Sequence, residues 1–600
     1  MIKEPKEVER NDYMIVNTVY LRPQKIDGTW YSDCLLIVYK ENGVKKFKII
    51  DAPKFSYYVT KKEFQNDKEF TEYASLLYVP EEKVDKVVCE YQNLAHSIID
   101  NLPPKEKSFY SMQRSNGVTG YRLLQGLHKS KYVHGSDFNI EDYYYNKIIT
   151  KYGPTEQSPS KAFFDIEVNA SNINTFASEL HSLSPVSHIS IFFEGIMYTY
   201  LLKFNDIEES ANMTEETLQS YKEEAIERQG KFGLKDVKFF LYEAGKELQM
   251  IKDYFSLVNE LKPDIICAWN LKFDIRYLLN RISVLTNSDL EVENSYGNRG
   301  GFNRTKTYKF SKIARQSILP EEFRALDYVM YSEDVMTRKV EDSSSYFKYA
   351  GYSTYIDMLT IYQNMTKSSK RDSYALDAIS EEDLDDHKDH FIGEHGETLG
   401  MIEAILQQYR KFTQYNLHDV MLIKRLDEKT KYQDIVWGVS QITSTRIHKA
   451  MKKTVCLKNF SVGRLKEAGI ILSNNRNSSY STKEVTEEDS EVEKEDLKGA
   501  FVADPNLNEP VGIQLTEDLK SSFIFDNVID EDIVSMYPKL ISAFNIDASL
   551  QLGLITVKEK KPNLNVHNIV SSIIAEDWIT LGNVTLELPT IAEMINELSN

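Results

Sequence analysis

The stretch Phe163-Phe164-Asp165-Ile166-Glu167-Val168 places two carboxylates two residues apart inside an otherwise apolar run. A short apolar run of this kind is typical of a buried strand. Side chains at positions i and i+2 of a strand leave on the same face, so Asp165 and Glu167 are expected to point together. Two such carboxylates repel each other unless one binds a proton or a cation compensates them, and a divalent ion held by oxygen ligands is the common compensation. The alternative is a solvated strand end in an acidic chain.

Composition limits the class of protein. Six hundred residues predict several domains, because single cores stop growing at about 250 to 300 residues. The four cysteines lie far apart and form no C-x-x-C pair, which indicates neither a disulfide framework nor a zinc site and favours a reducing cytoplasm. No apolar run is long enough to span a bilayer, and the first residues lack a signal-peptide core. We therefore expect a cytoplasmic protein, in the host cytoplasm if it is viral, with no membrane partner.

The net charge of −19 argues against a protein that simply coats nucleic acid, since such binding uses Lys and Arg to neutralise phosphates. The charge does not exclude an enzyme with a local basic groove and carboxylates that hold metal ions. Part of the acidic excess is local, because residues 484–496 read EVTEEDSEVEKED. This run predicts a disordered or solvated insert.

The first 155 residues predict a mainly β domain. Short apolar or alternating runs are separated by the turn signals Asp27-Gly28 and Asn42-Gly43, which is the pattern of antiparallel hairpins. The step Gly153-Pro154 is a plausible domain boundary. The tyrosines at 143–145 suit either a stacking surface or buried packing, and packing is the simpler interpretation.

Further strands and helices follow the opening strand. Residues 188–193 and 197–202 predict a hairpin that turns at Glu194-Gly195. Residues 251–261 have helical spacing and stop before Pro263. Residues 264–270 predict a second buried strand, and the seven residues 275–281 predict a helix.

Asp274 would therefore lie at a strand-to-helix junction, beside a positive helix end. It either caps that helix or adds a third carboxylate to the site. The surrounding Asn270-x-x-Phe273-Asp274 cluster is more than a cap needs.

The periodic segment 401–426 predicts a helix that contains Tyr415 and Asp419. Residues four apart lie on one face of a helix. A carboxylate there can hold a metal ion while the phenol orients an attacking water.

These three motifs, in this order, resemble the exonuclease motifs of family B DNA polymerases of tailed bacteriophages. The residues that carry the resemblance are Asp165-x-Glu167, Asn270-x-x-Phe273-Asp274 and Tyr415-x-x-x-Asp419. Farther on, the seven residues 532–538 (DIVSMYP) resemble the first palm motif D-x-x-S-L-Y-P, with Met for Leu. Residues 498–502 resemble the linker between exonuclease and palm.

The resemblance implies a 3′–5′ exonuclease that proofreads during DNA replication. Its four acidic residues would bind two Mg²⁺ or Mn²⁺ ions about 3.5 to 4 Å apart, which activate water and stabilise the leaving 3′ oxygen. Tyr415 would position the water, and Asn270 and Phe273 would hold the frayed primer end. The substrates would be single-stranded or mispaired 3′ ends of primer–template DNA. The implied metal ligands are Asp165, Glu167, Asp274 and Asp419.

The resemblance implies only part of a polymerase site. Asp532 would bind metal, the backbone around Ser535 and Met536 would lie near the dNTP triphosphate, and Tyr537 would lie under the incoming sugar. Neither Y-x-D-T-D-S nor K-x-x-x-N-S-x-Y-G is present. One palm carboxylate cannot hold two metal ions. We expect a split or truncated nucleotidyltransferase, completed by a second polypeptide with the fingers, the rest of the palm and the thumb. The apolar stripe of residues 591–598 suits docking or an ordinary core.

Three functions remain open. The chain is the exonuclease and partial palm of a polymerase, with a sliding clamp as a possible further partner. Alternatively, it is a free-standing 3′–5′ exonuclease with a vestigial palm, or a non-catalytic DNA-binding or assembly subunit of a replisome. The presence of all four carboxylates together with Tyr415 counts against the non-catalytic role.

The expected fold is a multidomain chain of α/β and α+β classes. We expect a mainly β domain at 1–155, an exonuclease domain at 156–440, a segment returning to the first domain at 441–482, the acidic insert at 483–497 and a partial palm at 498–600. The resemblance implies that the exonuclease domain is ribonuclease-H-like. The loop 296–301 either touches DNA through its Arg299 and the nearby Arg304 or is an ordinary surface loop.

Overall fold

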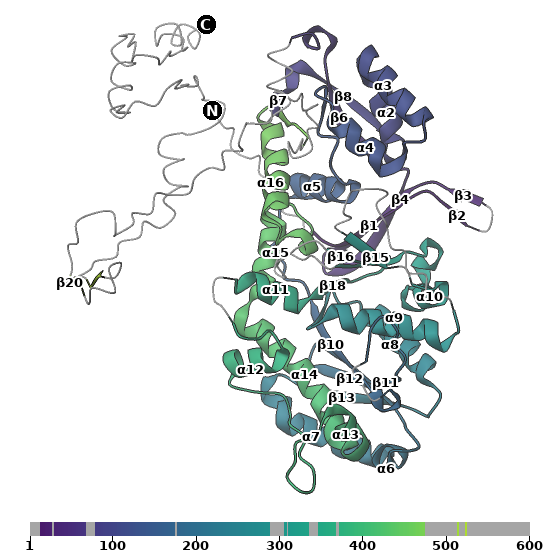
Figure 1. Cartoon of the computed structure of the whole chain (residues 1–600), viewed down its shortest axis with the longest axis vertical. Coiled ribbons are helices and arrows are strands. Elements are labelled where there is room, and N and C mark those ends of the chain that lie inside the picture. The colour runs from purple at the N-terminus through teal and green to yellow at the C-terminus, as the bar shows by residue number, and fades with distance from the viewer. Residues whose placement is uncertain are drawn as a thin grey trace. The chain divides into compact units, whose positions relative to one another are not determined.

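The computed structural model describes residues 13–26, 29–67, 78–173, 177–288, 305–308, 310–334, 346–367 and 371–474, together with the paired strands β20 (Ile513–Gln514) and β21 (Phe523–Ile524). The chain divides into two units, Met1–Ser481 and Thr482–Asn600, and the first contains all the elements discussed below (Figure 1). Several expectations fall outside the described residues: Asp532, Ser535, Met536, Tyr537, the linker 498–502, the acidic run, residues 591–598, Arg299 and Arg304. Among the described residues, no helix is both long and apolar enough to cross a membrane.

A six-stranded mixed sheet organises the centre of the first unit. Its spatial order is β13-β12-β11-β10-β14-β18, with β11 antiparallel to both of its neighbours and the remaining pairs parallel. The strands are β10 (Lys161–Val168), β11 (Val186–Phe193), β12 (Ile196–Leu202), β13 (Asp236–Tyr242), β14 (Ile265–Ala268) and β18 (Thr354–Asp357). The strand expected around Asp165 is therefore present, as part of the mixed α/β fold of a ribonuclease-H-like domain.

Local sequence explains the hairpin of β11 and β12. Glu194 and Gly195 both have positive φ, 51° and 89°, which is the type I′ geometry that matches the twist of paired strands. Every residue of β11 is buried, because both faces of the sheet are covered.

The two faces of the sheet pack against different helices. Phe164 and Ile166 of β10 belong to a core with α8 (Glu247–Leu261) and α9 (Leu271–Leu285). Phe163 points to the opposite face and packs with α7 (Glu215–Gln229), α14 (Tyr409–Thr430) and α15 (Tyr432–Ile442). Because alternate strand residues share a face, Asp165 and Glu167 leave β10 on the side of α14.

The first 155 residues contain strands followed by helices. The sheets are β1 (Tyr13–Leu21), β4 (Cys34–Glu41) and β5 (Val44–Asp51), and β6 (Lys54–Thr60), β8 (Val84–Glu90) and β9 (Val133–His134). Asn42 and Gly43 form the β4–β5 turn with positive φ. We expected a mainly β domain here. The structure also contains four helices that this expectation did not include, α2 (Leu94–Asn101), α3 (Pro104–Ser115), α4 (Gly120–His128) and α5 (Ile140–Tyr152). Leu94 and Ile98 of α2 are buried at helical spacing, a pattern too short to separate from strands by periodicity alone.

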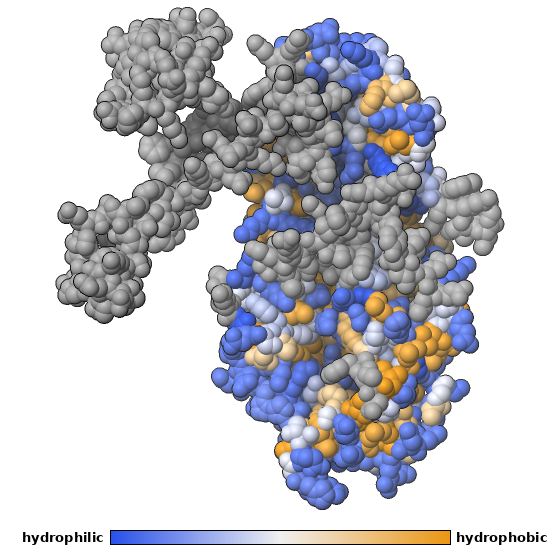
Figure 2. Space-filling model, in the orientation of Figure 1, coloured by the Kyte–Doolittle hydropathy of each residue, from blue (hydrophilic) through white to orange (hydrophobic). Residues whose placement is uncertain are grey.

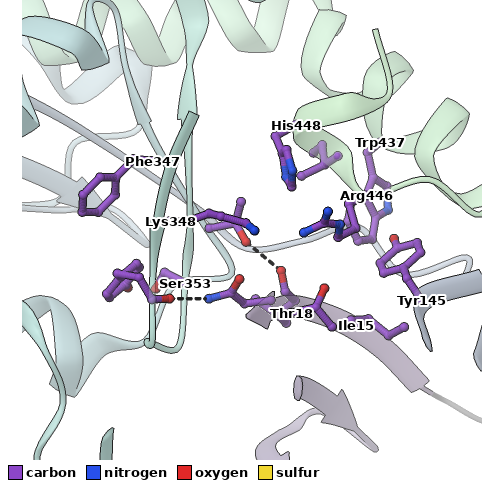
Figure 3. A pocket seen from close by; sticks show the side chains of 14 residues that line it. Ile15, Thr18, Tyr145, Phe347, Lys348, Ser353, Trp437, Arg446 and His448 are labelled. Carbon is purple, nitrogen blue, oxygen red and sulfur yellow. Dashed lines mark hydrogen bonds between the residues drawn. The ribbon is translucent and has the colours of Figure 1, made fainter. Parts of the chain in front are cut away.

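The segment after α15 returns to these first strands. After α16 (Lys453–Glu467), β19 (Ile470–Leu472) pairs antiparallel with β7 (Tyr78–Pro80). Nearby, Arg446 donates to Glu141 and Asp142 of α5, and Lys348 of β17 (Tyr346–Tyr349) also donates to Glu141. A cavity of about 30 Å³ lies beside these residues, with Lys348, Arg446 and His448 in its wall (Figure 3). It has room for water but not for a nucleotide.

Polar residues cover most of the coloured surface in Figure 2. Figure 2 shows an apolar area in the part of the view where Figure 1 places α8, α9 and α10 (Lys312–Ile318). Leu180, Leu183 and Ile313 are exposed. Scattered exposed apolar residues are normal on globular proteins.

Candidate active site

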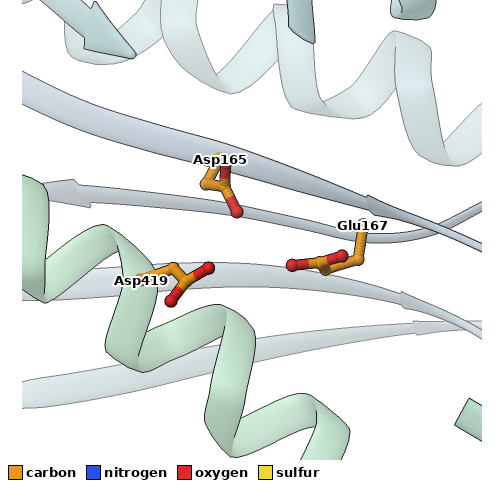
Figure 4. Close-up of side chains that lie close together, drawn as sticks. All are labelled: Asp165, Glu167 and Asp419. Carbon is orange, nitrogen blue, oxygen red and sulfur yellow. The ribbon is translucent and has the colours of Figure 1, made fainter. Parts of the chain in front are cut away.

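Three carboxylates from two elements converge between β10 and α14. Asp165 and Glu167 lie on β10, opposite Ser190 and His188 of β11. Asp419 projects from α14, which packs across this face of the sheet (Figure 4). One oxygen from each of the three side chains lies within 4.8 Å of the others, close enough to ligate a shared ion. Asp419 is only 1% exposed, whereas Asp165 and Glu167 are half-buried.

Asp274 provides a fourth carboxylate beside this cluster. The helix that contains it begins at Leu271, four residues earlier than expected, so Asp274 lies in the first turn of α9 and Asn270 is the N-cap. Asp274 therefore does not cap the helix. It is buried, and its charge interacts with those of Asp165 and Glu167, although it lies outside the group that meets within 4.8 Å.

Burial and mutual repulsion raise the pKa values of these acids. Burial, followed by the charge of Asp419, raises the pKa of Asp165 to about 7. Burial and the charges of Asp165 and Asp419 raise the pKa of Glu167 well above its usual value. Burial acts in the same direction on the pKa of Asp274, with further contributions from Asp165 and Asp357. Strongly raised pKa values in a cluster of this kind indicate a functional site.

The carboxylates fit divalent cations. Oδ2 of Asp274 and Oδ1 of Asp419 are buried, and neither has a hydrogen-bond partner in the described part of the chain. Unpaired buried carboxylate oxygens are costly, and hard cations such as Mg²⁺ prefer oxygen ligands. The donor set therefore suits the expected metal ions.

Lys388 is a site residue that the sequence analysis missed. Its ammonium contacts Oδ2 of Asp419 and donates to the Tyr415 hydroxyl at 3.0 Å. Burial acts to lower the pKa of Lys388, but the charges of Asp419 and its neighbours raise it well above the usual value. Lys388 lies in an irregular segment 31 residues before Asp419, and no periodicity or spacing in the sequence connects the two.

Tyr415 and Asn416 complete the face of α14. Burial and the charges of Asp419 and Glu167 raise the pKa of the Tyr415 phenol, so it remains protonated. Asn416 Nδ2 donates to Asp165 Oδ2 at 3.2 Å. Asn416 lies inside the quoted Tyr415-to-Asp419 motif, which was the available signal for it.

Asn270 and Phe273 lie at the start of α9, beside Asp274. Asn270 is exposed, and Phe273 is half-buried with its ring centroid 5.3 Å from that of Tyr277. Asn270 at the N-cap and Phe273 in the first turn both reach the surface, where the motif resemblance implies a DNA end.

Two ion-pair groups hold the segment that carries Lys388. Arg228 of α7 donates to both oxygens of Asp389 at 2.6 Å and contacts Nδ1 of His418 at 2.8 Å. Arg425 of α14 donates to Asp386 at 2.5 Å. Asp386 and Asp389 lie on either side of Lys388 in the chain, so these contacts attach the segment to α7 and α14. We name Arg228, Asp386, Asp389 and Arg425 the Lys388 clamp.

Part of the chain matches a family of known proteins. Residues 124–379 match a family model for the exonuclease domain of family B DNA polymerases. This match includes Asp165, Glu167 and Asp274, whereas Lys388, Tyr415 and Asp419 follow it in the chain.

The fold and the match define an exonuclease domain of ribonuclease-H-like type, as found in family B DNA polymerases. Among individual proteins, the chain is similar to the DNA polymerase delta catalytic subunit of Drosophila melanogaster. The two are 23% identical over 304 residues, which cover 50% of this chain and 22% of that protein. The chain thus spans under a quarter of that relative.

Proposed function

We propose that this chain removes nucleotides from the 3′ end of DNA by metal-dependent hydrolysis, as the proofreading part of a DNA polymerase. The observation that carries the proposal is the meeting of Asp165, Glu167 and Asp419 within 4.8 Å, with Asp274 beside them. Carboxylates that converge from two elements far apart in the sequence repel one another and destabilise the fold unless a cation compensates their charge.

The four carboxylates would hold two Mg²⁺ or Mn²⁺ ions. When bound, the ions supply activation of water and charge stabilisation for in-line displacement at the phosphate. The protonated Tyr415 hydroxyl orients the attacking water. Lys388 keeps a positive charge beside Asp419, where negative charge accumulates when the phosphate arrives. Asn270 and Phe273 support the terminal nucleotide by polar contact and stacking.

A labelled primer tests this proposal. The purified chain with Mg²⁺ should shorten a single-stranded primer from its 3′ end, and Asp419→Asn or Asp165→Asn should reduce the rate by about a thousandfold. Glu428→Gln is the matched control, because Glu428 is a largely exposed carboxylate on the same helix. The Glu428→Gln variant should degrade the primer at the same rate as the unmodified chain. Equal degradation by Asp419→Asn and the unmodified chain would reject the nuclease assignment and leave a DNA-binding or assembly role.

We propose in addition that Asp532 provides the first metal-binding aspartate of a polymerase site, with Ser535, Met536 and Tyr537 around the dNTP. The support is the resemblance of residues 532–538 to the first palm motif of bacteriophage family B enzymes. Nucleotidyl transfer with two metal ions needs a second aspartate, and the Y-x-D-T-D-S motif that would supply it is absent from the sequence.

Co-purification tests this second proposal. If a further polypeptide travels with the chain and primer extension requires both, the completed polymerase is supported. Extension in that complex should be abolished by Asp532→Asn, whereas 3′ degradation should persist. If the chain degrades 3′ ends but no preparation extends a primer, it acts as a free-standing exonuclease.

A further inference from the structure

A second cavity lies between α5, α16 and the β6–β8–β9 sheet, and none of its lining residues belongs to the acidic cluster. Its volume is about 470 Å³, within the range of about 300 to 1,000 Å³ that is usual for small-ligand sites. Its wall includes residues from β19, so it exists only where the returning segment 441–474 meets the first strands.

The cavity is basic in an acidic protein. Five lysines line it, namely Lys86, Lys147, Lys151, Lys458 and Lys466, against the acids Asp137 and Glu467. Asp137 is engaged by Lys458 at 2.6 Å. Among the described residues, no carboxylate forms a salt bridge with Lys86, Lys147 or Lys466. In a chain of net charge −19, this concentration of unpaired cations favours an anionic ligand.

Helical spacing explains how these lysines gather. Lys147 and Lys151 are four residues apart on α5, and Lys458, Val462 and Lys466 follow the same spacing on α16, so each set shares one helix face. The crowding is electrostatically unfavourable. Burial, followed by the charges of Lys86 and Lys147, lowers the pKa of Lys466.

The remaining wall is aromatic and apolar. Tyr143, Tyr58 and Phe138 line the cavity with Val462 and Ile471. The Tyr143 ring is fixed, because its hydroxyl hydrogen-bonds Ser56 at 2.7 Å and its ring contacts that of Phe55 at a centroid distance of 4.8 Å and an interplanar angle of 48°. Fixed aromatic rings next to cations suit a ligand with a flat base and a phosphate. A compact cavity is less suited to an extended acidic peptide.

We propose that this cavity binds a nucleoside phosphate, either as a free nucleotide or as one unit of a single strand, with the lysines on the phosphate and Tyr143 against the base. The site is separate from the acidic cluster and does not depend on nuclease activity.

Binding measurements in EDTA test the proposal without hydrolysis. Calorimetry with a nucleoside monophosphate and fluorescence anisotropy with a short labelled single strand, both at low salt, should detect binding. The triple variant Lys86→Gln, Lys147→Gln, Lys466→Gln should weaken it about tenfold or more. The matched control is Lys105→Gln, Lys235→Gln, Lys312→Gln, which removes the same charge from exposed positions elsewhere. Saturation by the free nucleotide at one per chain assigns a nucleotide site, and binding of the strand alone assigns a strand site.

A paired substitution tests the stacking. Tyr143→Leu should weaken binding several-fold, whereas Tyr143→Phe, which keeps the ring, should retain it. Thermal unfolding of each variant identifies loss of binding that comes from misfolding. The proposal is overturned if neither ligand binds, or if the pocket and control triples bind equally. It is also overturned if a synthetic peptide of residues 484–496 binds through the three lysines while nucleotides do not.

Discussion

At the scale of single residues, one cation, Lys388, lies against the acidic cluster. Lys388 contacts Asp419 and Tyr415, and its charge lowers the pKa values of Asp165, Glu167, Asp274 and Asp419, opposing the effect of burial. An ammonium in this position partly offsets the repulsion of the carboxylates before any metal ion binds. It also competes with metal ions for the same oxygens.

Replacing Lys388 should separate these two effects. We expect Lys388→Met to lower the maximal rate of 3′ degradation by about ten- to a hundredfold, because positive charge at the phosphate is lost. The Mg²⁺ concentration for half-maximal rate should fall, because the remaining cluster is more negative. A Mg²⁺ titration of the degradation rate measures both, with the exposed Lys235→Met as control. Unchanged rate and Mg²⁺ dependence would exclude Lys388 from the reaction.

His128 predicts a pH dependence of stability in the amino-terminal region. Burial, only partly opposed by Asp137, lowers the pKa of His128 to about 4. Its Nδ1 hydrogen-bonds Ser136 at 2.8 Å. As the pH falls from about 6.5 towards 4, the unfolded chain binds a proton that folded His128 does not, so the free energy of unfolding decreases, by about 3 kcal/mol at most.

Urea unfolding at pH 7.5 and pH 5 measures this effect. His128→Gln should lose less stability on acidification than the unmodified chain does. His96→Gln is the control, because the side chain of His96 is 60% exposed. An equal acid-induced loss in His128→Gln and the unmodified chain would contradict the assignment.

At the scale of elements, the Lys388 clamp joins an irregular segment to two helices. The bidentate contact of Arg228 with Asp389 fixes orientation as well as distance, as planar guanidinium–carboxylate pairs do. Asp389 lies against Arg228 and His418, and although burial opposes the shift, its contacts with these two side chains lower its pKa. We therefore expect Arg228 to hold Lys388 in position through Asp389.

Removing the clamp should reduce activity without touching the cluster. We expect Arg228→Ala to lower kcat for 3′ degradation about tenfold with little change in KM, because the segment no longer holds Lys388 in place. In the Lys388→Met background the same substitution should have little further effect, since the two changes are coupled. Arg410→Ala is the control, because Arg410 also links α14 to α7, through Glu224. Additive losses would show that Arg228 acts independently of Lys388.

At the scale of the whole molecule, segments that are far apart in the sequence pair and pack together. Strand β19 pairs with β7, which joins residues 470–472 to residues 78–80. Ile471 is buried in a small cluster with Tyr58, Val79 and Val84. The lysine-lined cavity has β19 in its wall, so this pairing also shapes that site.

Truncation of Ile471 should test how firmly the returning segment is held. Ile471→Ala should reduce the free energy of unfolding by about 2 to 4 kcal/mol, because it leaves a cavity between β7 and β19. Val88→Ala should cost about 0.5 kcal/mol or less, since Val88 is 59% exposed. Chemical denaturation monitored by tryptophan fluorescence measures both. Equal losses would mean that the contact of β7 with β19 contributes little to stability.

Local patterns in the sequence were sufficient for the strand with Asp165 and Glu167, the hairpin at Glu194-Gly195 and the helical face shared by Tyr415 and Asp419. Each depends on the period of one element or on one turn, and these are properties of neighbouring residues. They predicted the mixed fold and the elements that carry Asp165, Glu167 and Asp419. The start of α9 was placed too late, because Asp274 was considered as the cap, whereas Asn270, another residue type preferred at N-caps, precedes the first helical residue.

Tertiary structure alone decided the rest. It brought Asp419 to β10, left Asp274 beside the cluster and placed Lys388 against both Asp419 and Tyr415. It also placed lysines of α5, α16 and β8 around one cavity. These contacts join residues tens to hundreds of positions apart, and the packing of separate elements, which no local period encodes, determines which of them meet.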